Sequence, residues 1–338
     1  MLDNVTIIIP AHNRPERLQR LLYYYSGTGA HILVPDSSDK PYTGPLYGEH
    51  TTYLHRPRVH MLVKVREVLP LITTPYVLYC ADDDFAVPAG IAEVTRFLDA
   101  NPDFASAQGH YLTFTPHDNG RVRFLPRYIR NFDCRITCDD TLRRMELKKG
   151  MYASILYGVV RSEVFSKLYS YCFDAGGELR FRNLFLAEEF FNLAVLILGR
   201  YATVPCFFSA REQIKGSATE TTVPLEVIKT DPAYRDDFEG FIKSLAMLLA
   251  DHDGMPLEQA TGLIRAISLS PRDHQSVTFK RRVNSFLSRH RMLHWAARLS
   301  EWRYRQKGLK AVRHLPSYPC KHPTPETEAI VAAVNHVR

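Results

Sequence analysis

Residues 77–85 read VLYCADDDF, and the rest of the chain is arranged around this stretch. Its first three residues have the apolar, β-favouring character of a buried strand. The strand runs directly into Asp82, Asp83 and Asp84, which repel one another unless a cation lies among them. Hard divalent ions take oxygen ligands and commonly bind through one or two carboxylates plus substrate phosphates. We therefore predict a Mn²⁺ or Mg²⁺ site held by Asp84 and Asp82, with Asp83 as a direct ligand or a donor contact. A solvated acidic turn is the alternative.

The segment before this stretch has the pattern of a strand–helix–strand unit. Residues 5–10 (VTIIIP) form a continuous β-branched run, typical of a parallel strand buried on both faces. Pro15 suits the first turn of a helix, and residues 31–34 (HILV) predict a second strand. Asp36 follows this strand, where two neighbouring strand ends would form a crevice for a nucleotide. A turn-forming role is the alternative for Asp36.

The chain continues with alternating helical and strand patterns up to about residue 225. The predicted helices cover residues 59–71, 88–98 and 190–198, and the predicted strands cover residues 104–114 and 201–208. This order is that of an α/β protein that begins with a β–α–β unit. Amphipathic helical patterns prevail beyond it, so we divide the chain into residues 1–225 and a helical, basic region at residues 226–338.

Composition indicates a globular protein with a basic segment. Of its 338 residues, 45% are hydrophobic and 23% are charged. The net charge is +7, and residues 271–314 alone contain twelve Lys and Arg against two acids. Six scattered cysteines complete no zinc pattern. The sequence has no signal-peptide pattern and no run of about 18 apolar residues, so we expect a cytoplasmic protein with reduced thiols.

Four motifs follow one another along the chain. They are VTIIIPAHNRPERLQRLL at residues 5–22, an Asp-Ser-Ser turn at residues 36–38, YVLYCADDDF at residues 76–85, and Glu188-Glu189 ahead of a helix that ends in GRYATVP. This order resembles the family-2 type glycosyltransferases over residues 4–215. The resemblance implies the GT-A fold, a Rossmann-like α/β fold with a mostly parallel central sheet flanked by helices. It also implies a metal-dependent, inverting transfer of sugar from a nucleotide-sugar donor.

The resemblance also implies roles for single residues on the donor side. Pro10, Ala11, Asn13 and Arg14 would line the nucleotide site. Asp36 would accept hydrogen bonds from the nucleobase.

Further roles are implied on the reacting side. The three aspartates at residues 82–84 would hold the metal and touch the donor sugar. Lys64, on the predicted helix at residues 59–71, is a further candidate for donor binding.

Glu188 and Glu189 are the candidates for the catalytic base. The acceptor hydroxyl loses a proton as it attacks, and a carboxylate within hydrogen-bond reach can take it. The family commonly has Glu-Asp where this chain has Glu-Glu, so we favour Glu189, which occupies the place of that Asp. Asp139 or Asp140 is next in line. Two acids at the start of a helix are also explained by the helix macrodipole alone.

Other functions fit parts of the sequence. A nucleotidyltransferase that makes activated sugars usually has a Gly-rich, basic loop after its first strand. Here residues 11–15 read AHNRP, without glycine. The basic segment interleaves arginines with aromatic residues, which suits nucleic acid or an anionic membrane surface, and a solvated helical face is the plainer reading.

We favour the transferase, with a glycan, a lipid-linked molecule or a cell-envelope polysaccharide as acceptor. Such an acceptor would suit a peripheral contact with the inner face of the membrane. Nucleic acid is the weaker prediction for a partner.

Overall fold

The structure is a computed structural model that describes residues 1–127, 133–149, 154–213, 223, 225–270 and 323–337. Its strands are β1 (Val5–Ile8), β2 (His31–Asp36), β3 (Thr51–His55), β4 (Tyr76–Tyr79), β5 (Asp84–Ala86), β6 (Phe104–Pro116), β7 (Val122–Arg127), β8 (Arg135–Ile136), β9 (Val159–Arg161) and β10 (Arg200–Glu212). Its α-helices are α1 (Pro15–Tyr25), α2 (Met61–Val68), α3 (Pro88–Ala100), α4 (Thr141–Lys149), α5 (Ser162–Tyr171), α6 (Leu184–Leu198), α8 (Leu225–Ile228), α9 (Arg235–Asp253), α10 (Leu257–Leu269) and α13 (Pro325–His336). Short 3₁₀ helices are η1 (Leu69–Leu71), η3 (Ile155–Tyr157) and η4 (Pro232–Tyr234).

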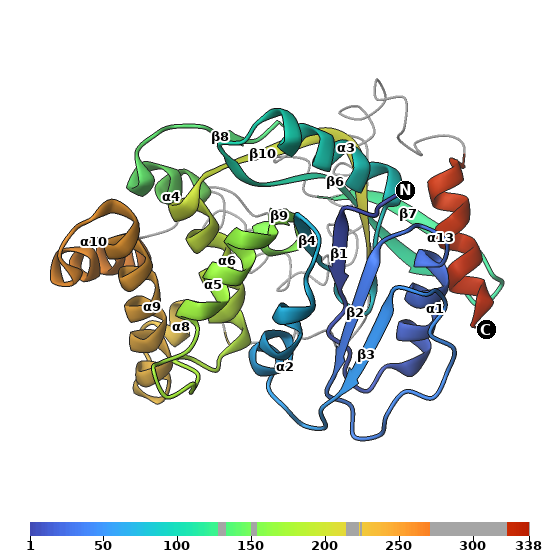
Figure 1. The fold of residues 1–338 in the computed structure, drawn as a ribbon, viewed down its shortest axis with the longest axis horizontal. Coiled ribbons are helices and arrows are strands. Elements are labelled where there is room, and N and C mark those ends of the chain that lie inside the picture. The colour runs from blue at the N-terminus through green and yellow to red at the C-terminus, as the bar shows by residue number, and fades with distance from the viewer. Residues whose placement is uncertain (128–132, 150–153, 214–222, 224, 271–322, 338) are drawn as a thin grey trace, which may run out of the picture.

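The protein is an α/β protein built on one central sheet flanked by helices (Figure 1). The strand order is β3-β2-β1-β4-β9-β6-β10-β5, with β7 beside β6 and β8 beside β10. The strands from β3 to β4 are parallel, and so are β6 and β10. The short β9 lies antiparallel between β4 and β6, and β5 lies antiparallel to β10. The sheet is therefore parallel around the first strand–helix–strand unit and mixed beyond it.

Alternating side chains of the central strands feed a hydrophobic core on each face of the sheet. In β1, Val5 and Ile7 belong to the core that includes α1, α3 and α13, whereas Ile8 belongs to the core that includes α2, α5, α6 and α9. In β4, Leu78 faces the first core and Val77 the second. Burial on both faces explains why these strands read as continuous apolar runs.

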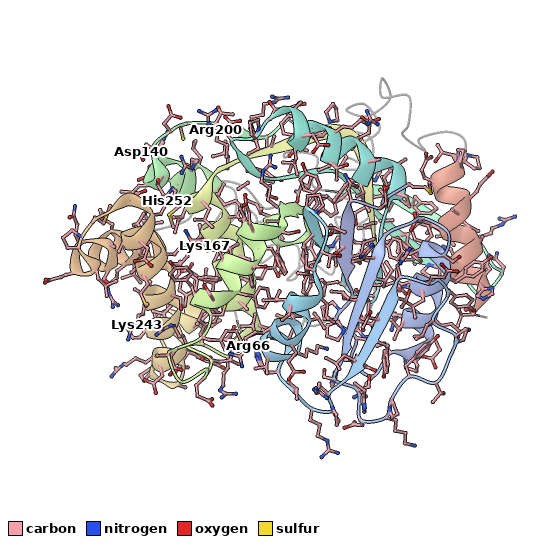
Figure 2. All side chains as sticks on the ribbon, viewed as in Figure 1. Arg66, Asp140, Lys167, Arg200, Lys243 and His252 are labelled. Atoms are coloured by element: carbon pink, nitrogen blue, oxygen red, sulfur yellow. The ribbon has the colours of Figure 1, made fainter. Side chains whose placement is uncertain are left out.

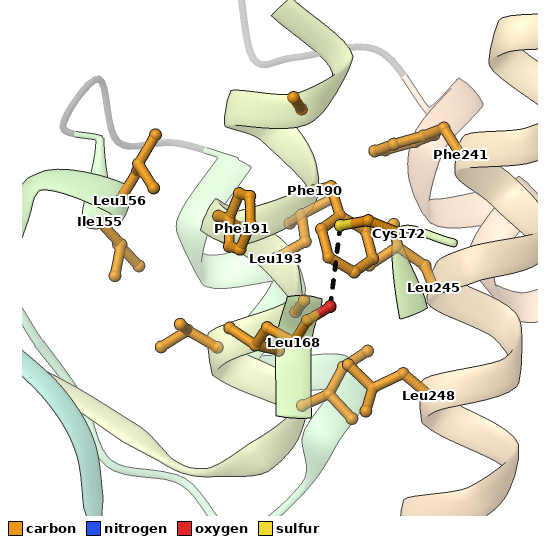
Figure 3. Packing of buried hydrophobic residues seen from close by; sticks show 14 of the residues in the cluster. Ile155, Leu156, Leu168, Cys172, Phe190, Phe191, Leu193, Phe241, Leu245 and Leu248 are labelled. Carbon is orange, nitrogen blue, oxygen red and sulfur yellow. Dashed lines mark hydrogen bonds between the residues drawn. The ribbon is translucent and has the colours of Figure 1, made fainter. Parts of the chain in front are cut away.

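The helices after residue 225 share a core with the earlier part of the chain. Figure 3 shows Phe190 and Phe191 of α6 packed in one cluster with Phe241 and Leu245 of α9. A Cβ atom on Gly240 would lie 1.7 Å from the carbonyl oxygen of Arg180, so only glycine allows α9 this close approach. The predicted division at residue 225 stays a prediction, and α9 packs directly against α6, which precedes that residue.

The C-terminal helix α13 lies along α1 (Figure 1). Its His336 ring stacks on Tyr23 with a centroid distance of 3.7 Å, and Nε2 of His336 lies 2.9 Å from the Tyr47 hydroxyl. A capping box at Thr324 and Thr327 begins the helix. The last helix thus completes the core on the α1 face of the sheet.

Candidate functional site

The loops after β1 and β2 are interlocked at one edge of the sheet. Ala11 pairs with Asp36 in parallel register, and the Asn13 N–H donates to Ser38 Oγ at 2.7 Å. Pro10 lies between β1 and this pair. The structure therefore brings Pro10, Ala11, Asn13 and Asp36 together beside two parallel strand ends, which is where open α/β sheets bind ligands.

Asp36 is buried, and both of its carboxylate oxygens are bonded inside the protein. Oδ1 accepts from the Ser38 N–H at 2.8 Å and from the Ser38 hydroxyl at 2.5 Å. Oδ2 accepts from the Tyr53 hydroxyl of β3 at 2.8 Å. The bond to the backbone two residues on is the turn-forming arrangement that we kept as the alternative for Asp36. Its contact with a nucleobase remains a prediction.

Lys64 of α2 is also buried, and it ties these two loops together. Its ammonium group donates to the Ala11 carbonyl oxygen and to Ser37 Oγ, the latter at 2.9 Å. Burial lowers the pKa of Lys64 to about 8, although the charges of Asp36 and Asp82 act in the opposite direction. The structure therefore places Lys64 behind the loops after β1 and β2, where it holds them to each other.

Asp82 and Asp83 converge on a single guanidinium nitrogen. Nη1 of Arg14 lies 2.9 Å from Asp82 Oδ1 and 2.8 Å from Asp83 Oδ2. Asp82 is buried, and Asp83 and Arg14 are partly exposed. Burial raises the pKa of Asp82, as does the charge of Asp83, and Arg14 opposes them. The cation that the sequence required among these aspartates is supplied, in this arrangement, by Arg14.

Asp84 faces a different arginine. The chain turns between Ala81 and Asp84, whose N–H donates to the Ala81 carbonyl oxygen at 3.1 Å, and Asp84 then begins β5. Its Oδ2 accepts from Arg211 Nε at 2.9 Å, and its Oδ1 from the Glu212 N–H at 3.2 Å. Burial raises the pKa of Asp84 to about 6, and Arg211 acts in the opposite direction. The predicted metal pair Asp82 and Asp84 therefore shares no partner.

The carboxylates do not fit a metal ion as the structure arranges them. The two that converge, Asp82 and Asp83, are spanned by Arg14, and Asp84 is held by Arg211 and a backbone N–H. Within the residues that the structure describes, no three His, Cys, Asp or Glu side chains gather as a metal group. The Mn²⁺ or Mg²⁺ ion predicted from the sequence stays a prediction.

Glu188 and Glu189 lie inside α6, not at its start. The helix begins at Leu184, and the Asn183 side chain caps it by accepting from the N–H groups of Phe185 and Leu186. The sequence expectation of a helix from residue 190 was therefore late, because the polar cap was not recognised. The macrodipole acts mainly within the first turn, so it does not explain two acids in the second turn.

Glu188 acts electrostatically on two buried tyrosines that also feel the aspartates of residues 82–84, the segment called here the acidic loop. Its charge, together with that of Asp82, raises the pKa of Tyr79, for which burial is the largest cause. It acts in the same sense on Tyr157, whose ring lies 5.9 Å from the Tyr79 ring. Glu188 makes no hydrogen bond to the described residues, whereas Glu189 does interact with the rest of the protein. Glu188 and Asp82 therefore act on the same buried hydroxyl group.

Asp139 and Asp140, the reserve candidates for the base, serve other elements. Asp140 Oδ1 accepts from the Arg143 N–H at 2.6 Å at the start of α4. Asp139 is exposed and pairs with Arg200 at 2.6 Å. Figure 2 shows Asp140 and Arg200 near each other beside α4. No described contact connects either aspartate with the acidic loop.

Arg211 and Glu212 were missed by the sequence analysis, which ended the last strand at residue 208. The guanidinium of Arg211 lies 4.4 Å from the centre of the Tyr157 ring, in addition to its bond to Asp84. Glu212 accepts from Arg17 at 3.2 Å and also from Arg20. The available signal was the apolar–polar alternation of residues 208–211 (FSAR), which continues the strand pattern.

The basic segment at residues 271–314 lies outside the described residues, so the predicted membrane or nucleic-acid contact is not tested. Residues 128–132 and 150–153 also lie outside the described part of the chain. Among the described helices, none is long and apolar enough to cross a membrane.

Comparison with known proteins gives a similarity in fold. No family model and no curated protein matches the sequence. The structure of S. aureus TarS 1–349 in complex with UDP is similar over 81% of this chain and 75% of that chain, with 13% identity and a TM-score of 0.45. The complex of TarS 1–349 with UDP-GlcNAc is similar over 99% and 90%, with 12% identity and a TM-score of 0.46. At these values we draw no argument about function from the likeness.

Proposed function

We propose that the protein is a glycosyltransferase that moves a sugar from a nucleotide-sugar donor to a hydroxyl acceptor. The observation that carries the proposal is the edge of the sheet where the ends of β1, β2 and β4 meet. Polar loops lie there beside a charged cluster, and the charge of Glu188 in α6 acts on a buried tyrosine on which Asp82 also acts. Nucleotide binding in a crevice at the strand ends is the general behaviour of such sheets.

The donor would lie along the loops after β1 and β2, with its diphosphate toward residues 82–84. Asp36 fixes the second loop, so in this proposal the nucleobase meets a rigid surface and need not order it. The leaving diphosphate carries negative charge that cations must neutralise. Arg14 is the partly exposed cation at that position, and Mn²⁺ or Mg²⁺ is the alternative predicted from the sequence.

The acceptor would be deprotonated by one of the two α6 glutamates. A base on the face opposite the leaving group gives inversion at the anomeric carbon, which is the stereochemistry that we propose. The resemblance in sequence favours Glu189. The influence of Glu188 on the pKa of Tyr79, which Asp82 also raises, favours Glu188.

The backbone of the first loop supports a transferase over a nucleotidyltransferase. A triphosphate cradle needs free backbone N–H groups in a glycine-rich loop. Here the Ala11 N–H donates to Pro35 O, and the Asn13 N–H donates to Ser38 Oγ. The His12 N–H lies 3.4 Å from Asp82 Oδ2. The three consecutive backbone N–H groups of residues 11–13 are therefore directed at acceptors within the protein.

The test is a screen of nucleotide sugars against the full chain by thermal unfolding, with and without Mn²⁺. We expect at least one nucleotide sugar to raise the melting temperature, and its nucleoside diphosphate to be released when candidate glycan or lipid-linked acceptors are added. Release of pyrophosphate from a nucleoside triphosphate and a sugar 1-phosphate, with no transfer from any nucleotide sugar, would contradict the proposal.

A further inference from the structure

We infer that Arg14 is the cation that binds the donor diphosphate, and that nucleotide binding at this edge does not require a divalent metal. This inference rests on the proposed nucleotide-sugar function. It follows from the position of one guanidinium group at the point where two carboxylates converge.

Arg14 occupies the position that a metal ion bound to Asp82 and Asp83 would need. Both carboxylates contact the same atom, Nη1, at 2.9 Å and 2.8 Å. A pair of ion pairs on one nitrogen fixes the direction of the guanidinium plane, and charge-assisted bonds of this kind are strong. A metal could bind these oxygens only after Arg14 had moved away.

Each aspartate of the acidic loop already faces an arginine of this chain. Asp82 and Asp83 are paired with Arg14, and Asp84 is paired with Arg211. These ion pairs reduce the repulsion that the three carboxylates would exert on an incoming diphosphate.

Arg14 keeps donors available for a ligand. Only Nη1 is used by the aspartates, and Nε and Nη2 make no hydrogen bond to the described residues. The side chain is 31% exposed, so these donors are accessible. Guanidinium groups bind phosphate oxygens through paired N–H donors. Arg14 also immediately precedes α1, whose N-terminal dipole favours a negative ligand at the same place.

The experiment is calorimetric titration of the full chain with UDP, GDP, CDP and ADP, in EDTA and in Mn²⁺. We expect the nucleoside diphosphate that binds to do so in EDTA within about threefold of its affinity in Mn²⁺. Arg14→Ala should weaken that binding at least about tenfold, and Arg14→Lys should recover part of the loss, because charge is kept and the paired donors are lost.

Arg17→Ala is the matched control. Arg17 lies in the first turn of α1, three residues after Arg14, has a similar side-chain exposure of 29%, and pairs with Glu212 instead of the aspartates. Its removal should change nucleotide affinity less than about twofold. Melting temperatures of all variants would show whether Arg14→Ala remains folded, and the comparison of EDTA with Mn²⁺ on the unmodified protein does not depend on any variant.

The outcomes separate this inference from the proposed function. Binding that is lost in EDTA and restored by Mn²⁺, or binding that Arg14→Ala leaves unchanged, overturns the role of Arg14 and leaves the transferase proposal intact. Binding of no nucleoside diphosphate under either condition overturns both.

Discussion

Two acidic loops follow neighbouring parts of the sheet, and they differ in what satisfies their carboxylates. In the loop after β2, Asp36 is bonded by neutral donors, the Ser38 N–H and hydroxyl and the Tyr53 hydroxyl. In the loop after β4, Asp82 and Asp83 are bonded by the charged Arg14, which keeps further donors exposed. In the loop after β2, the hydrogen bonds of Asp36 are satisfied within the protein. The loop after β4 is a charged cluster with donors left for a ligand.

This difference shows that an acid after a strand does not by itself define a binding residue. A buried carboxylate with hydroxyl and backbone partners stabilises a turn. A carboxylate that orients an arginine acts on a ligand through that arginine. The roles of the two loops can therefore be separated by changing the same type of residue in each.

The largest expected effect is on turnover, and it concerns the two glutamates of α6, which we compare with each other as we compare the two loops. Glu188→Gln and Glu189→Gln should behave differently, because adjacent helical residues diverge by about 100° and do not both face one cleft. We expect one variant to lose about 10²–10⁴ in turnover, the usual share of general base catalysis, while donor affinity stays within a few-fold.

Turnover and donor affinity measured side by side decide the assignment. The other member of the pair should lose less than about tenfold, and it serves as the matched control. Loss at Glu189 agrees with the resemblance in sequence, and loss at Glu188 agrees with its electrostatic influence on Tyr79 and Tyr157. Near-normal turnover in both variants would exclude this pair as the base.

The next effect concerns stability. Asp36→Ala leaves the partly buried Tyr53 hydroxyl and the buried Ser38 N–H without their acceptor, which should cost about 1–3 kcal/mol in the free energy of unfolding. Asp36→Asn retains one acceptor oxygen and should cost less. Asp83→Asn, in the partly exposed ion pair, should cost less than about 1 kcal/mol.

Denaturant unfolding of these three variants measures the contrast. Equal losses in Asp36→Ala and Asp83→Asn would mean that the two loops do not differ as described. For binding, we expect Asp36→Ala to weaken nucleoside affinity with little effect on pyrophosphate. Equal weakening of both ligands would assign Asp36 a purely structural role.

The smallest effect is a pH dependence from Lys64, which lies behind the loops after β1 and β2. Its folded-state pKa is lowered to about 8, so between about pH 8 and its ordinary value the unfolded chain binds more protons than the folded one. Stability from this group should therefore rise with pH across that window. We expect the stability of wild type relative to Lys64→Met to increase from about pH 7 to about pH 9.5. A constant or falling difference would contradict the lowered pKa.

The sequence was sufficient to predict the fold class and the edge of the sheet that carries the charged residues. Continuous apolar runs identified β1, β2 and β4, and the parallel order of these strands brings their ends together. The predicted helix at residues 190–198 was too short, because Asn183 begins it two turns earlier.

The pairing of charges could not be predicted in the same way. Arg14 and Asp82 are 68 residues apart, and Arg211 and Asp84 are 127 apart, so no local pattern connects them. The turn that separates Asp84 from Asp82 depends on pairing between β5 and the end of β10. Local sequence therefore indicated the acidic loop, and only tertiary contacts decide which arginine each aspartate meets.

The account depends most directly on where a nucleotide sugar binds. Amide hydrogen exchange of the full chain, with and without the nucleotide sugar that stabilises it, would locate the site by segment. We predict new protection in residues 82–84 and in the N-terminal turn of α1, with a smaller change in residues 36–39, which are already bonded internally. Protection confined to segments away from these strand ends, with none at residues 10–16 or 82–84, would contradict the central claim.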